Sequence, residues 1–256
     1  MSRVGGAEYI MIESFKLKIL ESGRCASKAN YCHKCAVRDR AFCAALDNTE
    51  IDELGELSDR KHYRAGETIF EQATKASVFA NIIEGTVKQS KLLPDGRQSI
   101  TGFLFPGDFV GKVYAENQTS FIEAVTDTHI CMFARGSLED LLDKRPHLAR
   151  RLFNLSNQSL ERAEEWMLLL GRKTAMEKLA SFLLLLSKRA AERGEDPDNI
   201  HLAMLRADIA DYLGLTIETV SRRISGLKSE QIIQLGAGNM VRIVDRRALE
   251  AAANNS

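Results

Sequence analysis

The side chains best suited to chemistry are cysteines crowded near the N-terminus. Of the five cysteines in this 256-residue chain, four lie between positions 25 and 43, and three of them form the pattern Cys32-x2-Cys35-x7-Cys43. Thiolates at this density can bind zinc or an iron–sulfur cluster. The fifth cysteine, Cys131, lies far along the chain and can close a four-sulfur site. The pattern therefore predicts a metal site, with Cys25 and Cys131 as rivals for the fourth ligand.

These cysteines also suit roles that need no cluster. Free cysteines often pack as small core residues, but packing alone does not account for such clustering. Disulfides need an oxidising compartment, and nothing in the sequence points to one. The nearest rival is structural zinc or a regulatory thiol switch. In the zinc case His33, between two of the cysteines, is a further candidate ligand; otherwise it is a solvated spacer.

Composition and charge indicate a cytoplasmic protein with no membrane partner. The length allows one large or two modest domains with a real core. Lys and Arg number 35 and Asp and Glu number 35, so any basic surface for nucleic acid has to be local. Glu8, Glu13, Lys16 and Lys18 interrupt the apolar N-terminal stretch. These charges exclude a signal-peptide core or a membrane span there.

The pattern of residues 60–134 predicts a β-domain. A weakly structured lead over 1–24 and a short helix over 50–57 come before it. Short apolar or alternating runs are then separated by turn signals such as Asp95-Gly96, which predicts a hairpin. This spacing indicates a β-sandwich or small barrel. The expected strands cover residues 68–70, 78–83, 86–93, 99–105 and 130–133.

Helices follow the β-domain. Ser137 and Asp140 resemble a capping box that opens a helical region, and Pro146 marks the first turn of a long helix reaching about residue 170. One apolar stripe of this helix can pack on the β-domain. A second stripe has the period of a seam against another helix, which favours a homodimer over intramolecular packing. The inner stripe is Leu148, Leu152 and Leu155, and the seam is Phe153, Leu160, Ala163, Met167 and Leu170.

Residues 206–228 have the form of a helix-turn-helix. Another amphipathic helix over 172–193 precedes it. The first helix of the motif ends at Gly214, and Thr216 can cap the second. Strands over 232–235 and 240–244, joined through Gly236 and Gly238, suggest a wing. The second helix is expected to turn Ile217, Val220, Ile224 and Leu227 inward. It presents Glu218, Thr219, Ser221, Arg222 and Arg223 outward, where a recognition helix meets base edges.

A metal-binding enzyme, such as a zinc hydrolase or a redox protein, is the rival from another class. The chain carries no His-Glu-x-x-His motif, no nucleophile elbow and no phosphate-binding glycine loop. We therefore expect a protein that is not an enzyme.

The order of these parts resembles the Crp/Fnr family of bacterial transcription factors over about residues 50–245. The resemblance rests on glycine-marked turns at Gly66, Gly85 and Gly107 and on the run from Glu218 to Arg222. The cysteine lead narrows it to FNR-type, FnrN/FixK-like members. It implies an α+β fold: a β-roll (a cyclic-nucleotide-binding-like jelly roll), a long dimerisation helix and a C-terminal winged helix-turn-helix. The implied divisions are 1–49 for the cysteine segment, 50–136 for the β-roll, 137–171 for the dimerisation region and 172–256 for the DNA-binding domain.

The resemblance also implies a function. It places an oxygen-labile [4Fe–4S] cluster on Cys32, Cys35, Cys43 and Cys131, whose loss favours monomers. The dimer is then expected to read a TTGAT-N4-ATCAA-like site on double-stranded DNA, with RNA polymerase contacted by loops such as 91–98. Cyclic-nucleotide binders in the family carry a Gly-Glu-Leu and an Arg-Ser. Here the region reads Gly111-Lys112-Val113-Tyr114 and Thr119-Ser120-Phe121. Without that arginine the phosphate loses its main partner, so no cyclic-nucleotide binding is expected.

On DNA, Arg222 suits guanine O6 and N7, and Glu218 suits a cytosine amino group. Ser221 is expected to contact a thymine or a phosphate, and Arg223 a phosphate. Arg206 and Lys228 add local positive charge, which supplies phosphate affinity despite the neutral total. Leu205 stands where relatives often have a capping threonine before the first helix of the motif, which removes about 1 kcal/mol of cap stabilisation.

Overall fold

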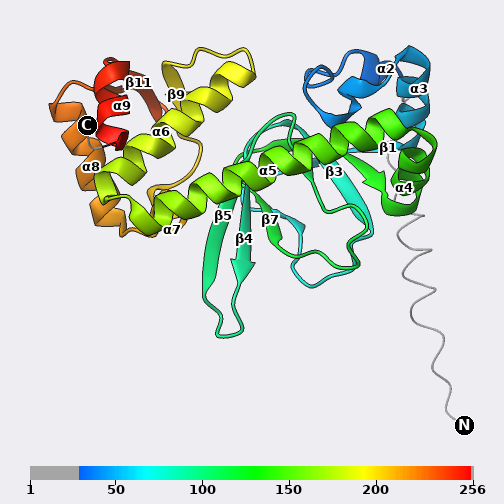
Figure 1. Ribbon diagram of the computed structural model, residues 1–256, viewed down its shortest axis with the longest axis horizontal. Helices are drawn as coiled ribbons and strands as arrows, with labels where there is room; N and C mark the ends of the chain where they lie inside the picture. The colour runs from blue at the N-terminus through cyan, green and yellow to red at the C-terminus, as the bar shows by residue number, and fades with distance from the viewer. Residues whose placement is uncertain (1–28, 255–256) are drawn as a thin grey trace, which may run out of the picture.

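The computed structural model, which describes residues 29–254, has the expected α+β architecture (Figure 1). A β-roll occupies the middle of the molecule, and a helical domain with a small sheet follows it. The long helix α5 (Pro146–Arg172) runs between the N-terminal segment and the C-terminal domain (Figure 1). The lead over 1–24 and Cys25 lie outside the described residues.

The β-roll consists of two four-stranded antiparallel sheets. Their strand orders are β1-β8-β3-β6 and β2-β7-β4-β5. Apolar side chains from both sheets meet between them, including Phe70, Ile82, Val87, Ile122 and Ile130. Burying this shared face stabilises the roll by about 25 cal/mol per Å² of apolar surface removed from water. The strands are β1 (Ser58–Tyr63), β2 (Thr68–Phe70), β3 (Val78–Glu84), β4 (Val87–Leu92), β5 (Gln98–Leu104), β6 (Phe109–Val110), β7 (Phe121–Ala124) and β8 (Thr128–Ala134).

The expected strands are present, and β4 and β5 form the hairpin expected around Asp95-Gly96. Three strands of the roll escaped sequence reasoning. Strand β1 is polar because it is an edge strand and its side chains are only alternately covered. Strands β6 and β7 are short. Short or half-exposed strands carry a weak period-2 signal, which explains these omissions.

Gly85 sits in the turn between β3 and β4 with φ +94°. A Cβ there would lie 2.5 Å from the Asp127 carbonyl oxygen and 2.8 Å from the Thr128 Cα. Because both atoms belong to backbone, the neighbour cannot simply swing away.

We expect Gly85→Ala to destabilise the fold by about 3 kcal/mol, from a left-handed residue plus steric overlap. Urea unfolding measures this loss. The control is Gly96→Ala, at φ +87° with nothing within 4 Å, which should cost only about 1 kcal/mol. Equal losses in the two variants would contradict the packing argument.

The N-terminal segment folds onto the outer face of the β1-β8-β3-β6 sheet. It consists of α2 (Ala29–His33), the 3-10 turn η1 (Phe42–Ala45) and α3 (Asn48–Leu57). A capping box begins α3: Asp47 accepts from the Glu50 N–H, and Glu50 accepts from the Asp47 N–H. This cap explains why the helix begins before the expected residue 50.

The capping box expected at Ser137 and Asp140 is wrong. Strand β8 passes directly into α4 (Arg135–Lys144). The N-cap residue of α4 is Ala134, whose side chain makes no capping hydrogen bond. The Arg135 N–H instead donates to the Ser77 carbonyl at 2.9 Å. The start of α5 at Pro146 is as expected, since proline is well suited to the first helical turn.

The C-terminal domain contains α6 (Ala175–Glu192), α7 (Arg206–Leu213), α8 (Ile217–Ser229) and α9 (Arg246–Asn254). Its sheet has the order β10-β11-β9. The predicted wing is β10 (Ile233–Leu235) paired with β11 (Met240–Ile243), and β9 (Asn199–His201) adds an unforeseen third strand. None of the helices within residues 29–254 combines the length and apolar character needed to cross a membrane.

Candidate metal centre and nucleic-acid interface

Cys131 occupies the outer face of the first sheet, under the N-terminal segment. It lies directly opposite Arg60 on β1 and Asn81 on β3. Directly opposed residues of antiparallel strands present their side chains on the same face. The alternate residues of β3 and β8, such as Ile82 and Ile130, face the interior of the roll instead. The register therefore turns Cys131 toward the cysteine segment.

The described cysteines share one hydrophobic core. Cys32, Cys43 and Cys131 are each 9% exposed and belong to the same cluster of buried side chains, against which half-buried Cys35 packs. Phe42, from η1, makes edge-on contacts with Phe109 and Phe133, at ring-centroid distances of 5.4 Å each. The aromatic contacts hold the segment on the sheet, and all four thiols are free.

The thiols influence one another electrostatically. Burial, reinforced by Cys35 and Cys32, raises the pKa of Cys43 to about 12. Burial and then Cys32 raise the pKa of Cys131 to about 12. The pKa of Cys32 is also raised, by burial and then Cys35. The thiols of Cys32, Cys43 and Cys131 are therefore protonated at neutral pH, and binding a metal through them would release protons.

Polar groups on the sheet act in the opposite direction and lower the pKa values of two of these thiols. Ser58 and Arg60 both act to lower the pKa of Cys32 and of Cys131. Asn81, 3% exposed and directly across from Cys131, leaves its Oδ1 buried without a hydrogen-bond partner. A buried polar atom without a partner costs about 1–3 kcal/mol, and this one lies on the face of the sheet that carries Cys131. Sequence reasoning missed these residues because cross-strand pairing leaves no local pattern.

The donor set fits an iron–sulfur group chemically. Cys32, Cys35, Cys43 and Cys131 come from two segments of the chain and share one core. The Asn81 amide lies directly across from Cys131, and with its oxygen and nitrogen exchanged it would present an N–H to sulfur. As they stand, no three His, Cys, Asp or Glu side chains among residues 29–254 are arranged to hold a metal ion. His33 is engaged elsewhere, with its Nε2 2.7 Å from Asp52 Oδ1, so it does not join the cysteines.

Helix α5 contributes directly to the cysteine core. Leu148 and Leu152, from the predicted inner stripe, are buried in the cluster that contains the cysteines, and Leu155 packs against it. The Arg151 guanidinium also donates to the Arg40 carbonyl at 3.1 Å, on the segment between Cys35 and Cys43. The cysteine segment and the long helix therefore pack as one unit.

The second apolar stripe of α5, the predicted seam, remains uncovered in the single chain. Large apolar side chains protruding into water along one helix face are typical of an interaction surface. Leu168, which the sequence prediction omitted, is 65% exposed as well. The exposed fractions of the predicted seam residues are 63% for Phe153, 58% for Leu160, 63% for Met167 and 39% for Leu170, and Ala163 is also exposed.

The helix-turn-helix forms as expected. Gly214 ends α7 in the left-handed conformation with φ +61° and ψ +43°. The Thr216 hydroxyl accepts from the Thr219 N–H at 3.2 Å and caps α8. At the start of α7 the Leu205 side chain makes no cap, but the Asp208 carboxylate accepts from the Leu205 N–H at 3.1 Å. This bond is one of the two hydrogen bonds of a capping box. The other needs a polar side chain at the N-cap, which leucine does not have.

The face of α8 is polar at its N-terminal half. Glu218, Ser221 and Arg222 are exposed, whereas Thr219 and Arg223 are half-buried. Its own backbone N–H and then the Thr216 side chain lower the pKa of Glu218, which is ionised at neutral pH. The inward side consists of Val220, Ile224 and Leu227, all buried.

The inward assignment of Ile217 is wrong, because this residue is 47% exposed. As the first residue of α8 it precedes the turn at which the helix meets the domain core. The exposed Ile217 thus adds one apolar side chain to the otherwise polar face of α8.

Comparison with known proteins agrees with this architecture. A family model described as a cyclic nucleotide-binding domain matches residues 60–145, and one described as a Crp-like helix-turn-helix domain matches residues 177–252. The two matches correspond to the β-roll and the winged domain. Together they define a transcription regulator that joins a domain of the cyclic nucleotide-binding type to a helix-turn-helix DNA-binding domain.

Relatives narrow the class. The chain is 37% identical to the transcriptional activator protein FnrL of Cereibacter sphaeroides, over 88% of this chain and 93% of that protein. It is 39% identical to the nitrogen fixation regulation protein FixK of Bradyrhizobium diazoefficiens, over 88% and 94%. The solved structure of FixK2 from Bradyrhizobium japonicum matches with a TM-score of 0.71 and 36% identity, covering 76% of this chain and 96% of that one. The chain belongs to the Crp/Fnr family as an FNR/FixK-type regulator, and these relatives are not enzymes.

Proposed function

We propose that this regulator is an oxygen-responsive transcriptional activator whose cysteines hold a [4Fe–4S] cluster that promotes dimerisation. The observation that carries the proposal is the shared core in which Cys32, Cys43 and Cys131 pack with Leu148 and Leu152 of α5. A change in the metal content of that core alters the packing of the helix whose other face is the exposed seam. Metal occupancy thereby biases the dimer interface.

The proposed ligands are Cys32, Cys35, Cys43 and Cys131. When bound, an iron–sulfur cluster supplies a centre whose reactivity depends on solvent exposure and on hydrogen bonds to sulfur. Cys35 is the half-buried member of the set, and the neighbouring Lys34 and Asp39 are exposed. Oxygen therefore has a short route to this side of the site. Asn81 and Arg60, which lie directly across from Cys131, are polar side chains of the sheet beside the proposed ligands.

On DNA the proposed dimer reads a palindromic TTGAT-N4-ATCAA-like site with α8. Arg222 is suited to guanine and Glu218 to a cytosine amino group. Arg222 Nη2 lies 3.5 Å from the Thr219 hydroxyl, a contact at the limit of hydrogen bonding that leaves the guanidinium available to a base. The β4–β5 hairpin, with Leu92 and Leu93 41% and 46% exposed, is the proposed contact for RNA polymerase.

Replacing Arg222 with Ala should cost about 1–3 kcal/mol of binding to the specific site and relax selectivity at one base pair. The reason is the loss of a bidentate contact to one guanine. Fluorescence anisotropy on the specific duplex, its single-base variants and a random duplex measures this. Lys228→Ala is the control, since a phosphate contact should weaken every duplex alike. Equal losses of Arg222→Ala on specific and random DNA would count against base reading.

The proposed function is tested by DNA binding with and without oxygen. Protein prepared anaerobically should bind the specific duplex as a dimer, and brief exposure to air should abolish binding and yield monomers. Apoprotein reconstituted with zinc alone is the comparison for the structural-zinc alternative. Binding that survives air unchanged, or that zinc restores in full, would contradict an oxygen-labile cluster.

A further inference from the structure

The loop after β5, residues 105–108, is held rigidly on the β-roll. Asp108 Oδ2 accepts from the Phe105 N–H at 2.8 Å. The Gly107 N–H donates to the Ile82 carbonyl at 2.8 Å, and the Ile82 N–H donates to the Asp108 carbonyl at 3.0 Å. These bonds fix the Asp108 carboxylate relative to β3, so the carboxylate can serve as a fixed point for other elements.

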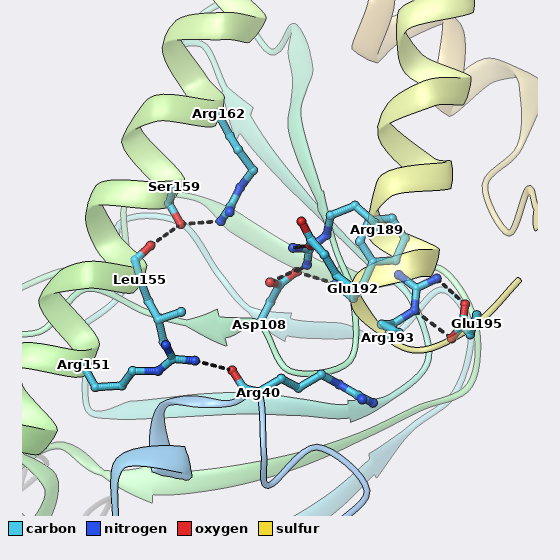
Figure 2. A network of polar contacts seen from close by, with 11 residues as sticks. Arg40, Asp108, Arg151, Leu155, Ser159, Arg162, Arg189, Glu192, Arg193 and Glu195 are labelled. Carbon is cyan, nitrogen blue, oxygen red and sulfur yellow. Dashed lines mark hydrogen bonds and ion pairs between the residues drawn. The ribbon is translucent and has the colours of Figure 1, made fainter. Parts of the chain in front are cut away.

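The C-terminal domain contacts this loop through α6. Arg189, on α6, places its Nη2 2.6 Å from both carboxylate oxygens of Asp108 (Figure 2). The Arg189 and Asp108 side chains are only 14% and 16% exposed. The guanidinium groups of Arg189 and Arg193 also stand over the Phe105 ring, 5.6 Å and 5.1 Å from its centroid. A half-buried, charge-assisted pair of this kind is stronger and more directional than an exposed one.

The cysteine segment touches the same loop from the other side. A Cβ on Gly107, whose φ is +98°, would lie 2.9 Å from Arg40 Cγ, so the Arg40 side chain packs directly on this glycine. Arg40 lies between Cys35 and Cys43, and Arg151 of α5 donates to its carbonyl (Figure 2). One short loop thus contacts the cysteine segment through Gly107 and the DNA-binding domain through Asp108.

Further contacts join α7 to the roll without passing through that loop. Lys88 Nζ lies 3.3 Å from Asp208 Oδ1, and the Ile100 N–H donates to Asp211 at 2.8 Å. Tyr212 stacks on Trp166 of α5 with ring centroids 3.8 Å apart. These contacts leave the polar face of α8 exposed, so the docked arrangement orients the recognition helix and does not cover it.

We propose that Asp108 is a positioning residue for DNA binding. Through Arg189 it fixes α6, and with it the winged domain, against the β-roll. Its neighbour Gly107 packs against Arg40, which links the same loop to the cysteine segment of that protomer. The inference rests on the proposed function for its DNA probe and for the role of the cysteines. A dimer reads two half-sites at a set spacing, so both recognition helices must be correctly oriented. If the winged domain is released from the β-roll, it can adopt many orientations in the free protein. Binding to DNA must then fix one of them, and this loss of conformational freedom lowers the affinity.

The test compares Asp108→Asn with Glu192→Gln. Asparagine removes the charge but keeps an oxygen for the Phe105 N–H. Glu192 pairs with the same Arg189 at 2.8 Å but is 46% exposed, which makes it the matched control. We expect Asp108→Asn to bind the TTGAT-N4-ATCAA duplex about tenfold more weakly and Glu192→Gln to stay within about twofold. Asp108→Glu, which keeps the carboxylate, should recover most of the affinity. The double variant Asp108→Asn/Arg189→Gln should lose no more than Asp108→Asn alone.

Two further readouts separate positioning from damage to the fold. Sedimentation should show an unchanged dimer, and hydrogen exchange in α6 and α7 should accelerate in Asp108→Asn but not in Glu192→Gln. Affinity equal to or above that of the wild type in Asp108→Asn would overturn the proposal, as would unchanged exchange in α6. If the wild type itself shows no preference for the duplex, the proposed function fails, while the exchange measurement still decides whether Asp108 holds the domain.

Discussion

Cys131→Ser should abolish the anaerobic iron–sulfur chromophore and specific DNA binding together. The cross-strand register turns Cys131 from β8 toward the cysteine segment, into the core shared with α5. A serine hydroxyl does not replace a thiolate as a ligand for a cluster held by cysteine sulfurs. Loss of this ligand removes the cofactor's attachment to the sheet and leaves it one cysteine short, so the cluster is not retained in the core beneath α5. Anaerobic absorption spectra and anisotropy measured on the same preparations test both losses.

The matched control is Cys25→Ser, which should keep both the chromophore and the DNA binding. Cys25 lies outside the described residues, and a site made only of Cys25, Cys32, Cys35 and Cys43 would give the metal no ligand on the β-roll itself. The reverse outcome, with Cys25 essential and Cys131 dispensable, would leave Cys131 as an ordinary core thiol. It would also separate the metal from the β-roll.

Ala163→Asp should convert the anaerobic dimer to monomer. Ala163 lies on the exposed stripe of α5 between Leu160 and Met167, where the partner helix is expected to pack. An aspartate in each protomer would be buried there beside its symmetry mate. A buried uncompensated charge costs about 3–5 kcal/mol, enough to raise the dimer dissociation constant by more than about a hundredfold.

Sedimentation velocity over a concentration series measures the shift. Asn154→Asp adds the same charge at an exposed position on the far side of α5 and should leave the dimer intact. An unchanged profile for Ala163→Asp, with the chromophore present, would remove this stripe from the interface.

Local signals account for the parts that sequence reasoning located. Gly214 and Thr216 mark the turn of the helix-turn-helix because a left-handed residue and a cap are required there by backbone geometry. Pro146 and the two apolar stripes likewise place α5. The polar edge strand β1 and the three-residue strand β9 lack such signals, and their pairing depends on neighbours distant in the chain.

The candidate site shows the same division. The spacing of Cys32, Cys35 and Cys43 can be read directly, whereas Asn81 and Ser58 join them only through strand register. The Asp108–Arg189 pair joins residues from two domains, and no periodicity relates them. Ile100 and Phe105 of the β-roll are even buried in the core of the C-terminal domain. Such contacts between distant segments required the folded structure.

The most direct test of the central claim is iron and acid-labile sulfide analysis of protein purified without oxygen, combined with its visible spectrum before and after air. We predict about four iron and four sulfide per chain, with a broad charge-transfer absorption that bleaches in air as specific DNA binding disappears. Stoichiometric zinc with no sulfide, or a colourless protein that binds the specific duplex equally well in air, would contradict an oxygen-sensing cluster.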